Sequence, residues 1–366
     1  MNEELRTKPT AQQAGGNSPH TDQVDSQSES PDATKNQSSS ASDILKTPKR
    51  RVTFFSCLIT LLVVGGVTIG AGVIIQPYLK PKADPNLTAP VAVKAKEDTS
   101  EAEELAGLPE HSITRGITQR RIESAKHPLI PLLRVAQTGL DWVNENVQDY
   151  SATIVSQVRL NGELGEERYM FCKILHEQEL EEGKKIPLSM YTRFLKPQSL
   201  AGQEAIWIKG YNKGKIIAHG AGLLNVKKLY LNPDGPIAMK GSRYPIRKLG
   251  MKNLIKQLIV KGKRDMKHDE CIASVKRGVM VDGCKCTMLE IKHPKQREHF
   301  EFHIARIYLD DERNIPLAYE GYLWPEKEGD DPPLLEKYFY TDVKLNIGLR
   351  GKDFSTKNPE YDYPRW

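Results

Sequence analysis

Residues 129–162, LIPLLRVAQTGLDWVNENVQDYSATIVSQVRLNG, decide the fold. In the first half, apolar residues recur at the i, i+3, i+4, i+7 spacing from Leu129 to Val147, which predicts an amphipathic helix. From Tyr150 to Leu160 the apolar period changes to two, which predicts a half-buried strand. Asn161-Gly162 then predicts a tight hairpin turn, with a second strand over Glu166–His176. Together these patterns predict a helix that covers an antiparallel sheet.

Further strand-like runs follow at fairly regular spacing: Leu188–Leu195, Glu204–Lys209, Lys215–His219, Cys284–Lys292, Phe300–Leu309, Leu317–Trp324 and Glu336–Leu345. A second amphipathic helix is predicted over Ile246–Lys263. A series of this kind favours an antiparallel meander over alternating βαβ units. A sheet of about nine to eleven strands must curl, close or split. The predicted class is α+β: a curled meander, an unclosed half-barrel, covered by two amphipathic helices.

Outward from this region, Val52–Ile75 reads VTFFSCLITLLVVGGVTIGAGVII and carries no charged residue. A helix of that length reaches roughly 36 Å, enough to cross a hydrocarbon core of about 30 Å. Lys46, Lys49, Arg50 and Arg51 precede it and favour a cytoplasmic N-terminus. A cleaved signal peptide is the alternative, but its apolar region is normally shorter and nearer the N-terminus. We therefore expect an uncleaved single-pass signal anchor in the inner membrane.

The anchor divides the chain into four parts. Residues 1–51 have the composition of a disordered cytoplasmic tail, and 52–76 form the transmembrane helix. Residues 77–127 are a proline-rich spacer with a short helix over Ser100–Ala106, and 128–366 are a β-rich periplasmic domain. The net charge is +6, and residues 1–51 are electrically balanced, so the excess lies beyond the anchor. Such a mild excess on the far side of a membrane disfavours nucleic-acid binding.

The sequence predicts no enzymatic activity and no cofactor. G-x-S-x-G, Walker and G-x-G-x-x-G motifs are missing from the chain. His293, His299 and His303 lack the spacing of a metal site in a strand. Paired catalytic carboxylates can come from distant segments, so an unrecognised hydrolase remains a third hypothesis. Cys284 and Cys286 have no second pair at ligand spacing, so we expect buried thiols, with a disulfide from Cys271 to one of them as the alternative.

Several ordered blocks resemble one bacterial family. They are DYSATIVSQVRLNGELGEERYMFCKILHE (149–177), PLSMYTRFLKPQSLAGQEAIWIKG (187–210), RYPIRKLGMKNLIKQLI (243–259) and the ending VKLNIGLRGKDFSTKNPEYDY (343–363). The family is known as domain of unknown function fifteen seventy-one and is common in planctomycetes. The resemblance covers about residues 130–363 and implies no established activity. More distantly, the predicted architecture is similar to the lipoprotein-carrier fold of outer-membrane lipoprotein-sorting proteins.

That distant similarity implies an apolar trough between the sheet and the helices. The side chains expected to line it are Tyr191, Phe194, Trp207, Leu254, Leu258, Tyr319 and Trp324. The ligand would be a lipid or an acylated protein, bound by a carrier, presenter or sensor. The alternative is a structural or protein-interaction module of the cell envelope.

Overall fold

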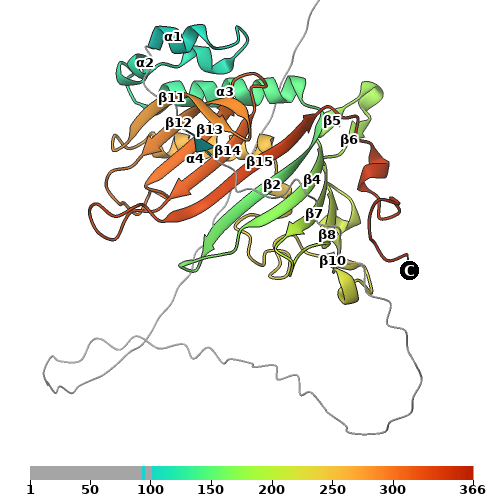
Figure 1. Cartoon of the computed structure of the whole chain (residues 1–366). Coiled ribbons are helices and arrows are strands. Elements are labelled where there is room, and N and C mark those ends of the chain that lie inside the picture. The colour runs from blue at the N-terminus through green and yellow to red at the C-terminus, as the bar shows by residue number, and fades with distance from the viewer. Residues whose placement is uncertain (1–92, 95–100, 366) are drawn as a thin grey trace, which may run out of the picture. The chain divides into compact units, whose positions relative to one another are not determined.

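The helix and the hairpin expected from residues 129–162 are present: the first strand of the hairpin lies in the middle of the strand order, and the helix lies along the upper side of the sheet in Figure 1. The computed structural model describes residues 93–94 and 101–365, so the predicted tail and anchor lie outside the described residues. Helix α3 (Leu129–Asn146) leads into β2 (Asp149–Leu160), which pairs with β4 (Arg168–Leu175). Asn161 and Gly162 both have positive φ, at 51° and 86°, as the tight turn after β2 requires. The two-residue strand β3 (Glu163–Leu164) pairs back onto β2.

Within the described residues the main sheet has 13 antiparallel strands and is not closed. Its order is β1-β11-β12-β13-β14-β15-β2-β4-β7-β8-β9-β10, with β3 beside β2. The remaining strands are β1 (Val93–Lys94), β7 (Ser189–Lys196), β8 (Glu204–Ile208), β9 (Ile216–His219), β10 (Leu229–Leu231), β11 (Ile272–Val281), β12 (Cys284–Lys292), β13 (Ile304–Asp310), β14 (Pro316–Tyr322) and β15 (Leu334–Leu345). A separate hairpin joins β5 (Gln178–Glu179) to β6 (Lys185–Ile186). The α+β class and the open antiparallel sheet are confirmed.

Strand β11 is absent from the predicted series because its alternation is interrupted. The register with β12 shifts between Lys276 and Val279, and Gly278 has a φ of 65°. A bulge of this kind adds a residue to one strand, so the apolar side chains on either side of it no longer share one period-two pattern. The three-residue strand β10 is too short to show a period at all.

The predicted helix over Ile246–Lys263 is interrupted. A 3₁₀ turn occupies Ile246–Lys248, and helix α4 (Met251–Asp265) begins after Gly250. Gly250 has a φ of 99°, and a Cβ there would lie 2.7 Å from the Tyr150 hydroxyl oxygen. That hydroxyl accepts a hydrogen bond of 3.0 Å from the Met251 N–H, so β2 supplies the missing N-terminal cap.

Helices α3 and α4 pack against one another and against the same face of the sheet, called here the inner face. Val143 of α3 and Ile255 of α4 share a core with Ile154 of β2 and Tyr340 of β15. At Gly262 the helices approach so closely that a Cβ would lie 2.8 Å from a Leu133 methyl carbon. None of the helices within 101–365 has both the length and the apolar character to span a bilayer.

Two terminal segments cover other parts of the sheet. The first contains α1 (Glu101–Ala106) and α2 (Gln119–Glu123), and its Ile117 and Ile122 pack beside α3. The second, residues 349–363, lies on the opposite face of β7 and β8, where Tyr361 stacks on Tyr191 with ring centroids 3.9 Å apart. With these faces covered, a hollow remains between the inner face and α4.

Candidate ligand-binding cavity

A cavity of about 610 Å³ lies on the inner face of the sheet, toward its β10 edge. Strands β2, β4, β7, β8, β9 and β10, with side chains of β14 and β15, form one wall, and α4 with residues 237–250 forms the other. Most of the wall is apolar, and its apolar residues include Ile154, Val158, Met170, Phe194, Ala205, Ile216, Ala218, Leu229, Leu231, Ile237, Ala238, Leu249, Leu254, Leu258, Tyr319, Tyr338 and Tyr340. The arrangement suits a ligand with an extended apolar part.

Strand alternation explains which side chains reach the cavity. On β7, Thr192 and Phe194 line it, while Tyr191 packs on the opposite face. Ala205 of β8 and Ala218 of β9 both line the cavity and are direct cross-strand partners. Because two small side chains face each other there, the wall does not fill the space in front of it.

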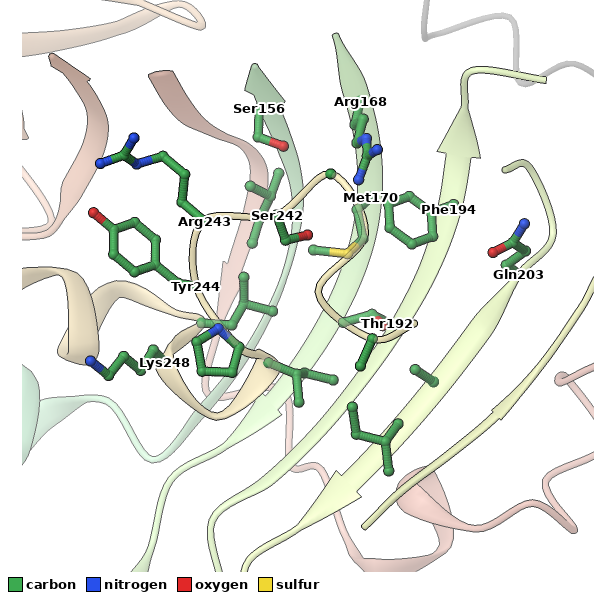
Figure 2. A pocket seen from close by; sticks show the side chains of 18 of the residues that line it. Ser156, Arg168, Met170, Thr192, Phe194, Gln203, Ser242, Arg243, Tyr244 and Lys248 are labelled. Atoms are coloured by element: carbon green, nitrogen blue, oxygen red, sulfur yellow. The ribbon is translucent and has the colours of Figure 1, made fainter. Parts of the chain in front are cut away.

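A segment called here the strap, residues 232–250, connects β10 to α4 and passes in front of the sheet (Figure 2). At Gly241 (φ 68°) it approaches β4 so closely that a Cβ would lie 1.9 Å from the Arg168 guanidinium. That guanidinium donates a hydrogen bond of 3.2 Å to the Lys240 carbonyl. Burial lowers the pKa of Arg168 below its usual value. Arg168, Met170, Phe194 and Ser242 all border the same space (Figure 2).

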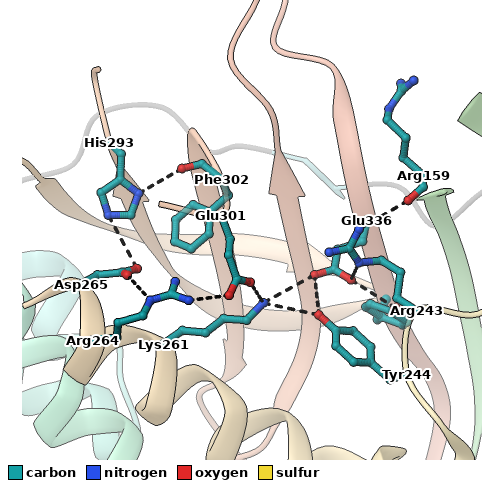
Figure 3. Close-up of polar contacts among 11 residues, drawn as sticks. Arg159, Arg243, Tyr244, Lys261, Arg264, Asp265, His293, Glu301, Phe302 and Glu336 are labelled. Carbon is teal, nitrogen blue, oxygen red and sulfur yellow. Dashed lines mark hydrogen bonds and ion pairs between the residues drawn. The ribbon is translucent and has the colours of Figure 1, made fainter. Parts of the chain in front are cut away.

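A buried carboxylate fastens the strap to the sheet. Glu336 of β15 is completely buried and lies 3.0 Å from the Arg243 guanidinium. It also accepts a hydrogen bond of 3.1 Å from the Tyr244 hydroxyl, and the Lys261 ammonium of α4 is 3.9 Å away (Figure 3). We call these four residues the strap latch. Burial lowers the pKa of Lys261, but the nearby Tyr244 and Glu336 more than offset it, so the net shift is upward.

The polar contacts continue from the latch along α4 (Figure 3). Lys261 lies 2.9 Å and Arg264 lies 2.5 Å from the Glu301 carboxylate, and Arg264 also contacts Asp265 at 3.0 Å. Burial raises the pKa of Glu301, but hydrogen bonds from Arg264 and Lys261 outweigh it and the net shift is downward. Asp265 lies 3.8 Å from buried His293, whose pKa is lowered by burial. The chain of charges therefore ties α4 to the sheet behind the cavity.

Cationic groups outnumber carboxylates around the cavity. Arg168, Lys227, Arg243, Lys248 and Lys261 line it, against Glu204 and Glu336. Glu336 is taken up by the strap latch, and Glu204 accepts a hydrogen bond of 3.2 Å from the backbone of Asp362. Within the described residues, Lys227 and Lys248 have no ion-pair partner. The cavity therefore presents positive charge beside an apolar interior.

The seven side chains expected to line a trough divide into two groups. Phe194, Leu254, Leu258 and Tyr319 do line the cavity. Tyr191 lies on the opposite face. Trp207 is part of the inner core, and its indole donates to the Gly214 carbonyl at 3.2 Å. Trp324 follows β14 and donates to the His293 carbonyl at 2.9 Å.

The strap residues of the cavity wall were not predicted. Ile237, Ala238 and Tyr244 lie in an aperiodic segment before the predicted helix, so no amphipathic pattern marks them. One signal could have identified these lining residues: the segment carries apolar residues although it shows neither a helical nor a strand pattern.

The disulfide alternative from Cys271 is wrong. Cys271 lies just before β11, at the end where Ile272 pairs with Lys292, whereas Cys284 pairs with Val281 at the other end of the hairpin. Cys286 pairs with Val279, eight residues from Cys271, so even this nearer thiol lies roughly 25 Å away along the strands, far beyond the span of about 7 Å that a disulfide allows between Cα atoms. Within the described residues all four cysteines are free. Burial raises the pKa of Cys271 to about 11, so this thiol is unreactive at neutral pH.

The predicted histidines take part in local packing. His293 donates to the Phe302 carbonyl at 3.0 Å, His303 donates to the His293 carbonyl at 2.8 Å, and His299 stacks on His268. Across residues 93–94 and 101–365, no group of three or more His, Cys, Asp or Glu side chains is placed to hold a metal ion.

Comparison with known proteins identifies a family and several partial structural likenesses. The profile of a family described as a protein of unknown function, DUF1571, matches residues 147–363. No curated protein sequence matches the chain. A putative outer-membrane lipoprotein-sorting protein domain from Vibrio parahaemolyticus is similar at 16% identity and a TM-score of 0.29, over 60% of this chain and 97% of that one.

A LolA-superfamily protein from Nitrosomonas europaea is similar at 11% identity and a TM-score of 0.23, over 60% of this chain and 97% of that chain. The MucA/MucB complex structure from Pseudomonas aeruginosa is similar at 15% identity and a TM-score of 0.31. That match covers 60% of each chain.

Proposed function

This chain belongs to the DUF1571 family of proteins of unknown function, and we propose that it is a non-enzymatic protein that binds a lipid in the cavity. The observation that carries the proposal is an apolar hollow of about 610 Å³ between the sheet, the strap and α4. Ligand pockets typically measure roughly 300–1,000 Å³ and combine apolar walls with a few placed polar groups. An acyl chain meets that description better than a polar metabolite does.

The charges around the cavity narrow the ligand class. Arg168, Lys227 and Lys248 line a cavity whose two carboxylates are engaged by other groups. Arg168 is the half-buried member of this group, and a partly desolvated cation favours an anionic partner more strongly than one in bulk water does. We therefore propose a lipid with an anionic end, such as a phosphate or a carboxylate.

The proposal also places the domain at a membrane. Val52–Ile75 is the anchor, the N-terminus is cytoplasmic and the cavity lies on the extracytoplasmic side. A tethered domain works within reach of its anchor, so the protein would receive, present or sense lipid close to the inner membrane.

Filling the cavity tests the proposal. Full-length protein is purified in a mild detergent, and native mass spectrometry and lipid extraction measure the bound lipid. Ala205→Trp adds a large side chain to the wall of the cavity. We expect co-purified anionic lipid near one molecule per wild-type chain and a strong loss in the filled variant, because its indole occupies the ligand's space.

A tryptophan placed elsewhere is the control. Ile272→Trp changes a 57% exposed residue at the start of β11, near the opposite edge of the sheet, and should leave the bound lipid unchanged. Wild-type protein without lipid, or equal lipid in both variants, would overturn the assignment of the cavity.

A further inference from the structure

Two exposed aliphatic side chains, Val226 and Ile237, line the cavity, and a third, Leu223, lies three residues before Val226 in the same connection. Leu223 is 80%, Val226 62% and Ile237 69% exposed, the first two in the connection between β9 and β10 and the third in the strap. Lys227 and Lys228 follow Val226 directly; Lys227 is exposed and Lys228 is half-buried. We call these five residues the rim patch.

The rim patch joins two kinds of surface that favour a bilayer. Large aliphatic side chains exposed together at the edge of a cavity commonly mark a binding surface. Lysines beside them can extend their ammonium groups to lipid phosphates while their methylene stems remain in apolar surroundings. Within the described residues neither Lys227 nor Lys228 has an ion-pair partner, so both charges are available.

We propose that the rim patch docks on an anionic bilayer surface, with Leu223, Val226 and Ile237 among the headgroups. The inference rests on the proposed anchor and lipid ligand, and adds how the ligand reaches the cavity. Because Val226, Lys227 and Ile237 belong to both the patch and the cavity wall, a docked patch opens the cavity toward the membrane. About 17 residues separate Ile75 from Val93, which limits that strand to roughly 60 Å from the end of the anchor.

Charge complementarity favours a bilayer over a protein as the occupant. Two adjacent lysines flanked by aliphatic side chains match a surface that is anionic and apolar at once. Each well-placed lysine contributes about 1 kcal/mol near an anionic membrane, which corresponds to roughly a fivefold change in the docked-to-free ratio.

The experiment measures whether the patch contacts lipid. Full-length protein carrying Cys57→Ser and Cys284→Ser receives Leu223→Cys, labelled with the fluorophore NBD. It is reconstituted into vesicles of phosphatidylcholine, with or without phosphatidylglycerol, that contain spin-labelled lipid as quencher. We expect a blue shift and stronger quenching with phosphatidylglycerol. Lys227→Glu with Lys228→Glu should reduce the docked-to-free ratio by at least about tenfold.

Two controls match these changes. Ile272→Cys places the same probe on an exposed aliphatic residue near the other edge of the sheet, and it should stay unquenched. Lys213→Glu with Lys215→Glu gives the same change in net charge in the β8–β9 connection, at the other end of these strands, and should leave quenching intact.

Equal quenching at positions 223 and 272 would overturn the docking surface, as would indifference to the Lys227 and Lys228 changes. A probe at 223 that is blue-shifted but unquenched in the vesicles would also overturn it, because another protein surface would then cover the patch. If lipid still co-purifies and Ala205→Trp removes it, docking has failed while the cavity assignment stands. Quenching without any co-purified lipid would instead retain the docking surface and reject the ligand.

Discussion

The strap latch gives a prediction whose size follows from burial. Glu336→Gln removes the carboxylate charge but keeps nearly the same shape. The Glu336 side chain is 1% exposed, and its charged partners are the Arg243 guanidinium at 3.0 Å and the Lys261 ammonium at 3.9 Å. In the variant, the Arg243 and Lys261 cations would lie beside a neutral amide. The expected loss of stability is therefore that of leaving a buried charge without its partner.

Removing one partner of a buried ion pair typically costs about 3–5 kcal/mol. Two features place the expected cost of Glu336→Gln at the lower end of this range. The Arg243 side chain is 26% exposed and can turn partly toward water, and Lys261 keeps Glu301 at 2.9 Å. We therefore expect the free energy of unfolding to fall by about 3 kcal/mol, roughly a hundredfold in the unfolding equilibrium.

Glu290→Gln is the matched control. It breaks the pair with Arg306 at 2.7 Å on a part of the sheet where the two side chains are 24% and 34% exposed. Pairs of this kind contribute about 0–1 kcal/mol because water already screens the charges. Both variants are measured by denaturant titration of the same chain, followed by tryptophan fluorescence, at one salt concentration.

Amide hydrogen exchange locates the loss. In Glu336→Gln we expect faster exchange in residues 242–250, because the strap is released before the sheet unfolds. A Glu336→Gln cost no larger than that of Glu290→Gln would refute the reasoning, since the strap would then not depend on the buried carboxylate. Unchanged exchange of the strap with a large global loss would assign Glu336 to the sheet alone.

Three further predictions concern the fold and the cavity. Burial lowers the pKa of His176 from 6.5 to about 4, so the native state favours its neutral form and stability is lost as pH falls from 6.5 toward 4. His176→Gln should therefore reduce the loss of unfolding free energy between pH 7 and pH 5 by about 2 kcal/mol, as measured by denaturant titration at both values. Gly262→Val should lower stability by about 1–3 kcal/mol, because its side chain would overlap Leu133 where α3 meets α4, whereas an equal loss in exposed Val260→Thr would argue against that contact. If the cavity holds no ligand, Ala205→Trp should raise the midpoint of thermal unfolding by filling it, and if lipid occupies the site, the midpoint should fall with the lost lipid.

The regular elements were accessible from the sequence because each carries its own period. Residues 129–162 contain a helical period, a period of two and a turn dipeptide, and the structure places α3, β2 and the hairpin there. The interruptions of these elements were harder to predict from the sequence. Gly250 interrupts the helix predicted over Ile246–Lys263, because Tyr150, a hundred residues earlier, occupies the space beside it and caps the start of α4. A contact so distant along the chain leaves no local pattern.

The predicted lining residues show a similar limit. Tyr191 and Phe194 are three residues apart in one strand, so period two places them on opposite faces, and both could not line the same cavity. The alternation indicates that only one of them faces inward, but not which one. The choice depends on residues 349–363, which cover the outer face, where Tyr361 stacks on Tyr191. Aromatic content alone therefore overestimates a ligand site.

The contacts of the strap also indicate where the cavity opens. Residues 240–244 are fixed to the sheet through Lys240 to Arg168 and through the strap latch. Residues 232–239 differ, because within the described part of the chain their hydrogen bonds and the Asp234–Arg247 ion pair stay inside the strap. Moving residues 232–239 away from the sheet would therefore break no polar contact to the sheet like those of Glu336. Ile237 of the rim patch lies in this part of the strap. The end of the strap with the fewest polar contacts to the sheet is thus the end that the proposed docking brings to the bilayer.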